Sequence, residues 1–147
     1  MAEKVVVGYD GSEHSKKALD TAIDWAKKTP DSEIIITCSQ ERPGPAIGFR
    51  GLDFGVEEMF EKLVQRIEAE LAEAAAICEK AGVRAATVCT ADAPDEAMVK
   101  VARDSGANLI IVGVKGAGGR QGQRSHIGSV TSKLLNEAGG VIPVLIV

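Results

Sequence analysis

The residues best suited to chemistry gather in one stretch, between Gly113 and Thr131. An apolar run stops at Gly113, a loop dense in glycine and arginine follows, and Gly128-Ser129 opens a predicted helix. Glycine lets backbone N–H groups approach a ligand closely, because no Cβ blocks the way. The first turn of a helix leaves N–H groups unpaired and carries partial positive charge. This combination predicts an anion site, usually for phosphate.

The same loop departs from the two best-known nucleotide-binding motifs. A Walker loop needs glycine, four residues and then Gly-Lys-Ser or Gly-Lys-Thr, and the chain contains no such run. The dinucleotide fingerprint Gly-x-Gly-x-x-Gly begins at Gly116 and Gly118, but its third glycine is replaced by Gln121. The loop therefore predicts a phosphate site by its setting between a strand and a helix, with a flexible connector as the alternative.

Basic side chains inside this loop contrast with a chain whose net charge is −4. The possible phosphate contacts are Lys115, Arg120, Arg124 and His126. His126 could also act as an acid or base, although a lone loop histidine is more often simply solvated. A general nucleic-acid binder would show a clustered basic face, so we expect no nucleic-acid partner.

Asp10 directly follows the first apolar run, where a carboxylate can meet a base, a ribose hydroxyl or a metal. The alternative is that Asp10 only shapes the turn, as Asp-Gly pairs often do. We find no His, Cys and Asp cluster with metal-ligand spacing, and no Gly-x-Ser-x-Gly nucleophile elbow. The sequence therefore predicts no catalytic residue and no protein metal site.

Continuous apolar runs alternate with amphipathic segments along the whole chain. The runs predict strands at 4–9, 34–38, 83–90, 108–112 and 141–147. The amphipathic segments predict helices from Ser12 or Ser15 to about 28, at about 56–81, from 94 to Gly106 and at 129–138, with a long loop at 40–55. Unbroken apolar strands are typical of a parallel sheet that is covered on both faces.

Right-handed crossovers turn this β-α order into a doubly wound, Rossmann-like α/β fold. We predict five parallel strands in the order 3-2-1-4-5, within a single domain over residues 1–147. Ligands of such sheets bind at the carboxyl ends of the strands, near the switch point. Three stretches fall there: 8–12, 39–41 and the loop after Gly113.

Composition agrees with one ordinary domain, since the chain has 147 residues and is 45% apolar with few aromatics. Its three cysteines, Cys38, Cys78 and Cys89, are expected to be buried free thiols in a reducing cytosol. The start shows no signal peptide, and no apolar run is long enough to cross a membrane. We expect a cytoplasmic protein without a membrane partner.

The final apolar strand, from Val141 to Val147, would be an aggregation hazard at a sheet edge unless it were paired or covered. A two-fold homodimer across that strand is the natural solution. Burial beneath helices in a monomer is the alternative.

Taken together, these residues resemble the universal stress protein family along the whole chain. The opening Val5-Val6-Val7-Gly8-Tyr9-Asp10-Gly11-Ser12 is similar to the first strand and Asp-containing turn of that family. The run from Ala107 to Gly113 resembles its fourth strand, and Gly128-Ser129-Val130-Thr131 with the segment 143–147 resembles its ending. The resemblance implies an adenine nucleotide alpha-hydrolase-like fold.

The ATP-binding branch of that family carries Gly-x2-Gly-x9-Gly-Ser/Thr, and the resemblance carries roles with it. It implies that Gly8, Asp10 and Ser39 line adenine and ribose and that Gly113 contacts ribose. Phosphates would be held, mainly by backbone N–H groups with two hydroxyls assisting, at Gly116, Gly128, Ser129, Val130 and Thr131. ATP, AMP or ADP would be the ligand, Mg²⁺ would bind to its phosphates, and a homodimer would form through the last strand.

One departure separates this chain from the pattern: the spacer 117–127 has eleven residues, so the phosphate loop is lengthened by two. Three functions stay open. One is an ATP-binding regulatory or stress-response module without fast chemistry. Another is an enzyme that slowly hydrolyses ATP or transfers its phosphoryl group, with Arg120, Arg124 or His126 stabilising the developing charge. The third is a nucleotide-free dimeric scaffold.

Overall fold

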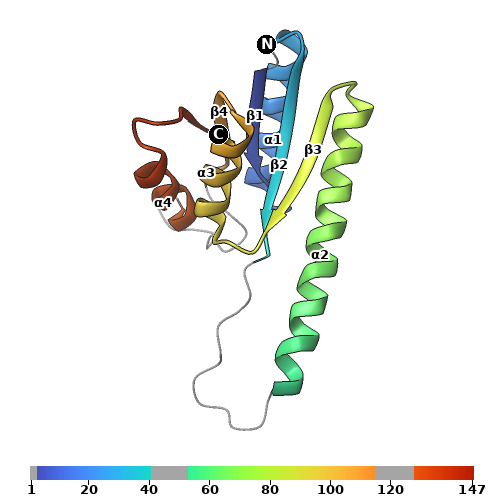
Figure 1. Cartoon of the computed structure of the whole chain (residues 1–147). Helices are drawn as coiled ribbons and strands as arrows, with labels where there is room; N and C mark the ends of the chain where they lie inside the picture. Colours follow the sequence, from blue (N-terminus) through green and yellow to red (C-terminus); the bar gives the residue numbers. More distant parts are fainter. Residues whose placement is uncertain (1–2, 41–52, 115–127) are drawn as a thin grey trace.

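A computed structural model describes residues 3–40, 53–114 and 128–147, with the backbone alone described for 53–56. Five parallel strands form one sheet in the order β3-β2-β1-β4-β5, which confirms the predicted order (Figure 1). The strands are β1 Glu3–Gly8, β2 Ser32–Ser39, β3 Arg84–Thr90, β4 Leu109–Val112 and β5 Val144–Ile146. The helices are α1 Glu13–Lys28, α2 Asp53–Lys80, α3 Pro94–Ser105 and α4 Ser129–Ala138.

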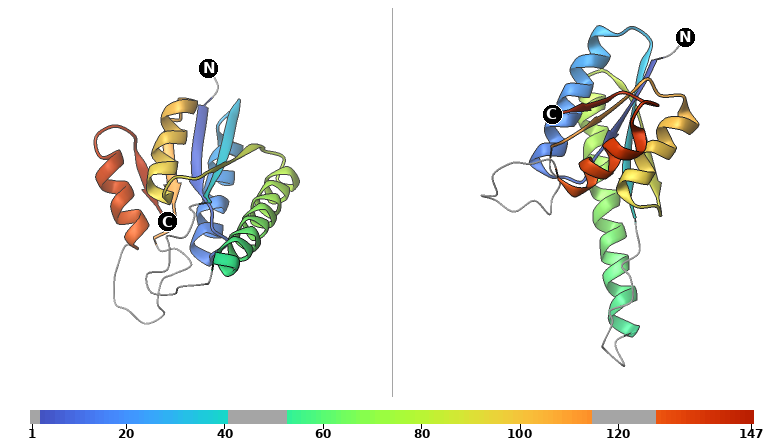
Figure 2. Two further views of the ribbon diagram at one scale, coloured as in Figure 1. Left: turned by 60° about the horizontal axis from the view of Figure 1, so that its bottom comes forward. Right: turned by 90° about the vertical axis from the view of Figure 1, so that its left-hand side faces the viewer.

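Alternate residues of the central strands belong to two separate apolar cores. Val5 and Val7 of β1 pack with α1 and α2, whereas Val6 packs with α3 and α4. Side chains of a strand alternate between the two faces, so each unbroken apolar run contributes side chains to both cores. Figures 1 and 2 show the resulting arrangement, in which pairs of helices flank the sheet. The doubly wound architecture is thus the one that the strand patterns predict.

Local signals set the bounds of the helices. Ser12 caps α1, because its side chain accepts a hydrogen bond from the Ser15 N–H at 3.2 Å. Pro94 occupies the first turn of α3, and Gly106 ends that helix with a φ of +70°. The predicted bounds of α4 agree with the observed Ser129–Ala138, while α2 begins three residues earlier than predicted, at Asp53.

The last strand is shorter than the predicted 141–147 and spans only Val144–Ile146. The N–H groups of Val141 and Ile142 both donate to the Ala138 carbonyl, so these residues belong to the turn that ends α4. An apolar pattern cannot reveal this turn, because the unpaired carbonyls at a helix end accept hydrogen bonds from backbone N–H groups of any residue type. β5 still lies at the sheet edge and pairs with β4.

The expectation of three buried thiols holds for Cys38 and Cys78 and is wrong for Cys89, which is exposed. Cys89 lies on β3, and β3 is the other edge strand of the sheet. Within residues 3–40, 53–114 and 128–147, no helix is both long and apolar enough to cross a membrane.

Candidate functional site

A pocket lies at the carboxyl ends of β1, β2 and β4, the place where the topology predicts ligand binding. Its floor comes from the strand ends and its sides from the first turns of α3 and α4. The lining residues are Gly8, Tyr9, Asp10, Ser15, Thr37, Cys38, Ser39, Pro94, Ala97, Met98, Val112, Gly113, Val130 and Thr131. Apolar walls with a few polar groups are typical of a site for a small organic ligand.

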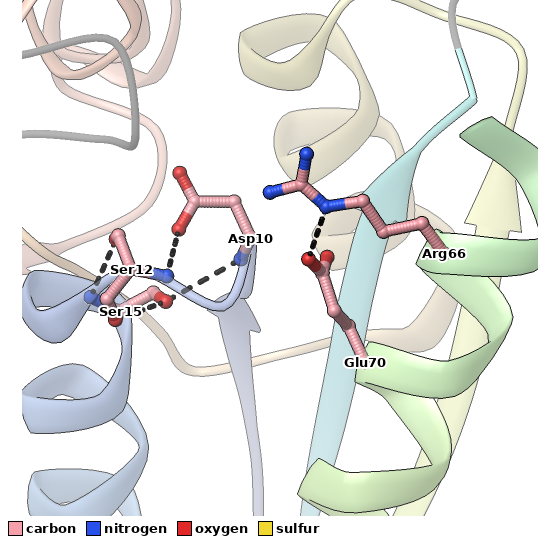
Figure 3. Close-up of polar contacts among 5 residues, drawn as sticks. All are labelled: Asp10, Ser12, Ser15, Arg66 and Glu70. Carbon is pink, nitrogen blue, oxygen red and sulfur yellow. Dashed lines mark hydrogen bonds and ion pairs between the residues drawn. The ribbon is translucent and has the colours of Figure 1, made fainter. Parts of the chain in front are cut away.

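The turn from β1 into α1 is held by a short chain of hydrogen bonds (Figure 3). Asp10 Oδ1 accepts from the Ser12 N–H at 2.9 Å, and Ser15 Oγ donates to the Ser12 carbonyl at 2.9 Å. The backbone N–H of Asp10 donates to Ser15 Oγ at 3.4 Å. Asp10 therefore shapes the turn and also lies in the pocket wall, so the two interpretations of this residue are compatible.

Helix α2 places a charged pair near the β1–α1 turn, outside the pocket lining, and the sequence analysis missed this pair. Its first half projects past the carboxyl ends of the strands (Figures 1 and 2). Arg66 Nε donates to Glu70 Oε1 at 3.0 Å, and the two side chains lie across from Asp10 (Figure 3). A Cβ placed on Gly11 would be 3.0 Å from Glu70 Oε1, so the α2 carboxylate touches the β1–α1 turn.

Burial and nearby carboxylates raise the pKa of Tyr9, whose ring is in the core beneath this turn. Burial is the larger cause, followed by Glu73, Glu70 and Asp10. Desolvation and negative neighbours both disfavour the phenolate. Tyr9 is therefore a neutral hydroxyl at physiological pH, and its side chain is no candidate for a base.

Two glycines leave no space for a side chain at this end of the sheet. A Cβ on Gly113 would lie 2.7 Å from His14 Cβ and 2.8 Å from the His14 carbonyl oxygen. A Cβ on Gly8 would lie 2.6 Å from Met98 Sδ. Gly113 thus allows β4 to pack against the backbone of α1, a requirement that is separate from any ligand.

The first turn of α4 faces the same pocket through Val130 and Thr131. Thr131 is buried, and its hydroxyl donates to the Gly113 carbonyl at 2.9 Å. The Gly128 N–H donates to the Val114 carbonyl at 2.7 Å, which fixes the helix start against the end of β4. Ser129 is exposed and lies outside the pocket lining. Backbone N–H groups in this first turn have no acceptor within the helix.

β2 contributes one polar group that was predicted and one that was not. Ser39 lines the pocket, and its hydroxyl donates to the Asp92 carbonyl. Thr37 is 2% exposed, and among the described residues its Oγ1 has no hydrogen-bond partner. The only signal for Thr37 in the sequence is a threonine that interrupts the apolar run Ile34-Ile35-Ile36.

The structure brings together most of the predicted site residues that it describes, while five others lie outside the described part of the chain. Gly8, Asp10, Ser39, Gly113, Val130 and Thr131 all line the pocket. Gly116 and the possible phosphate contacts Lys115, Arg120, Arg124 and His126 fall in 115–127, which the structure does not describe. Among the described residues, no three His, Cys, Asp or Glu side chains are grouped to hold a metal ion.

Comparison with protein-family models matches the Universal stress protein family over residues 1–147. The universal stress protein YxiE of Bacillus subtilis is 28% identical over 151 residues, covering 100% of this chain and 99% of the relative. A universal stress protein solved in complex with cAMP is 28% identical, with a TM-score of 0.67 and coverage of 99% and 95% of the two chains. A family protein from Arabidopsis thaliana solved with AMP bound is 17% identical, with a TM-score of 0.67 and coverage of 99% and 90%.

Proposed function

The chain belongs to the universal stress protein family, and from that premise we propose that it binds adenine nucleotides as a regulatory, stress-response module. The observation that carries the proposal is the pocket at the carboxyl ends of β1, β2 and β4, with the first turn of α4 on one side. β1 lies between β2 and β4 in the sheet, so the strand order changes direction here: β2 and β3 lie on one side of β1, and β4 and β5 lie on the other. Ligands of open α/β sheets bind in the crevice at such a switch point.

The adenine ring would occupy the apolar part of the pocket. Ala97 and Met98 of α3 and Val112 of β4 provide its walls. Thr37 lines the pocket, and its Oγ1 is buried without a partner among the described residues, so a ring nitrogen or amino group that reached it would satisfy it. Two solved structures of the family contain cAMP and AMP, and both of these ligands carry adenine and ribose.

Ribose would lie between Asp10 and Gly113, and the phosphates at the first turn of α4. A phosphate has acceptors only, and the Thr131 hydroxyl already donates to the Gly113 carbonyl. We therefore assign phosphate binding to the backbone N–H groups of Ser129, Val130 and Thr131, and to Gly128 the role of leaving space for it. Thr131 would position the turn. Ser129, whose side chain is exposed, could add its hydroxyl.

ATP would bind here together with Mg²⁺, and the ion would not need a site built from protein ligands alone. Mg²⁺ keeps several waters and is usually held by substrate phosphates with one or two carboxylates. The described residues offer no cluster of three metal-ligating side chains, and Asp10 is the carboxylate in the pocket wall. The ion would therefore arrive with the β- and γ-phosphates and neutralise part of their charge.

A homodimer through the last strand is also part of the proposal. β5 is an edge strand, Leu145 on it is 42% exposed, and Val141 just before it is 60% exposed. An apolar strand at an edge invites pairing with another chain, and a two-fold axis lets the same strand pair with its copy. Charged substitution at Leu145 would then shift the molecular mass in solution from dimer to monomer.

Calorimetric titration with AMP, cAMP and ATP, the last with and without Mg²⁺, tests the proposal. We expect saturable binding of adenine nucleotides and much weaker binding of GTP. The substitution Gly128→Val should lower the affinity for AMP and ATP at least tenfold, because the valine side chain fills the space that the phosphates would occupy. Adenosine binding is the control, since it lacks phosphate and should be unchanged. Absence of saturable binding at millimolar ATP, AMP and cAMP would overturn the proposal.

A further inference from the structure

Two of the three cysteines lie side by side on neighbouring strands. Cys38 of β2 and Cys89 of β3 are partners in the parallel register of the sheet. Cys38 belongs to the core under α1 and α2, and Ala85, four residues before Cys89, packs against the same core. Because side chains alternate along a strand, Cys89 points to the face that Cys38 occupies. The two thiols are close enough to interact electrostatically.

The pair is asymmetric in its access to solvent. Cys38 is 9% exposed, whereas Cys89 is exposed because β3 has no further strand beyond it. The third cysteine, Cys78 of α2, is 0% exposed and has no cysteine partner in the register. The chain therefore holds one paired thiol couple with a solvent-facing member and one isolated thiol.

The backbone allows a bond between the pair. Neighbouring strands of a sheet lie about 4.8 Å apart, within the roughly 4.4–6.8 Å between Cα atoms that disulfides span. The Cβ atoms of a disulfide are about 3.8 Å apart, so the strands must close slightly at this point. β3 is an edge strand that pairs with β2 alone, so this closure would disturb a single strand pair. A bond formed with such movement is more easily reduced than a relaxed one.

We propose that Cys38 and Cys89 form a reversible redox pair that a peroxide closes to a disulfide. Hydrogen peroxide meets the exposed Cys89 thiolate, transfers one oxygen to give the sulfenic acid, and leaves as hydroxide, which takes up the thiol proton to become water. The Cys38 sulfur then attacks the Cys89 sulfur and displaces a second water. Overall, two thiols and one peroxide give one disulfide and two waters, and two electrons pass from sulfur to oxygen.

The pair borders the proposed nucleotide pocket. Cys38 lines that pocket between Thr37 and Ser39, so the disulfide would tie one pocket wall to the edge strand. Burial, followed by the charge of Cys89, raises the pKa of Cys38 to about 11. Burial also raises the pKa of Cys89. The thiolate is the reactive form, so the reaction is slow at neutral pH and accelerates as the pH rises.

Intact-mass analysis of the full chain after hydrogen peroxide treatment at pH 7 and pH 9 tests the pair. Protein is then unfolded, and its remaining thiols are alkylated. We expect two of three thiols to be lost with a mass decrease of two hydrogens, faster at pH 9, and to return with dithiothreitol. The variant Cys78→Ser should keep this behaviour, whereas Cys89→Ser should lose it.

Any of these results in the wild-type chain would overturn the pair: all three thiols alkylated after prolonged treatment at pH 9, sulfinic acid as the main product, or a disulfide between two chains. Loss of two thiols in Cys89→Ser would do so as well. The measurement uses no nucleotide, so it stands or fails separately from the proposed function. Nucleotide affinity of the oxidised protein, measured afterwards, shows whether closing the pair changes the pocket.

Discussion

The two ends of one sheet differ in how their polar groups are satisfied. At the amino end, polar groups find partners within the fold: Asn108 Oδ1 accepts from the Lys4 N–H at 3.0 Å, and the Asn108 N–H donates to the Lys4 carbonyl at 2.8 Å. At the carboxyl end, the Thr37 hydroxyl is buried beside an open pocket with no partner among the described residues. The polar groups named at the amino end are partnered within the fold, whereas the carboxyl end leaves the Thr37 hydroxyl without a partner among the described residues.

Three glycines also differ between the two ends of the sheet. Gly82 and Gly106, which follow helices at the amino end, have φ values of +74° and +70°, and a Cβ there would meet nothing within 4 Å. Gly113, at the carboxyl end, would place a Cβ 2.7 Å from His14 Cβ. The first two are required by backbone conformation and the third by space. Gly82 and Gly106 therefore end helices, while Gly113 brings two backbones together.

The largest expected effect is on the free energy of unfolding of Gly113→Ala. The added Cβ meets backbone atoms of His14 at 2.8 Å, which cannot rotate away, so β4 and α1 must separate. Overpacking of this kind typically costs about 1–3 kcal/mol, and we expect the upper part of that range. Urea denaturation measures it.

The matched control for Gly113→Ala is Gly82→Ala, the same substitution at an open position. It should cost about 1 kcal/mol, the strain of a left-handed alanine. If the two variants lose equal stability, space does not distinguish the two ends of the sheet, and the comparison fails.

A smaller and more specific effect is expected for Thr37→Val. The substitution removes a buried hydroxyl that has no partner among the described residues. The free energy of unfolding should therefore rise by about 1 kcal/mol or stay unchanged. Affinity for AMP should fall about two- to tenfold, the worth of one hydrogen bond of roughly 0.5–1.5 kcal/mol. Denaturation and calorimetry on the same preparation measure both quantities.

Thr131→Val is the control for Thr37→Val, because both threonines are 2% exposed and line the pocket. The Thr131 hydroxyl donates to the Gly113 carbonyl, so its removal leaves a carbonyl unpaired and should lower the free energy of unfolding by about 1 kcal/mol. A fall in AMP affinity without a loss of stability in Thr37→Val, beside the loss of stability in Thr131→Val, supports the ligand role of Thr37. Loss of stability in both with no loss of affinity in Thr37→Val would contradict it.

Sequence reasoning predicted what depends on local pattern and on general topology. The apolar runs predicted the strands, right-handed crossovers allow the observed order, and the helix signals placed α4 from Ser129 to Ala138. Asp10 was placed at the pocket because it directly follows β1, and no contact across the fold was needed for that inference. These features are encoded within short segments.

Features that depend on contacts between distant segments could not be predicted. Gly113 was interpreted as a ligand contact, but its crowding against His14 exists only once β4 packs on α1. Arg66 and Glu70 are a common helical i, i+4 pair by sequence, and only the packing of α2 places Glu70 beside Gly11. Exposure of Cys89 likewise follows from the edge position of β3, which an apolar run does not show.

The smallest expected effect lies at the amino end, where Arg84 Nη2 donates to Asp31 Oδ1 at 2.9 Å. The two side chains are 60% and 65% exposed, so water and salt screen their attraction. Arg84→Gln should lower the free energy of unfolding by no more than about 0.5 kcal/mol, and high salt should remove the difference. AMP affinity should not change, because the pair lies at the opposite end of the sheet from the pocket. A change in AMP affinity would show that the two ends of the sheet are energetically coupled, and it would contradict the contrast drawn between them.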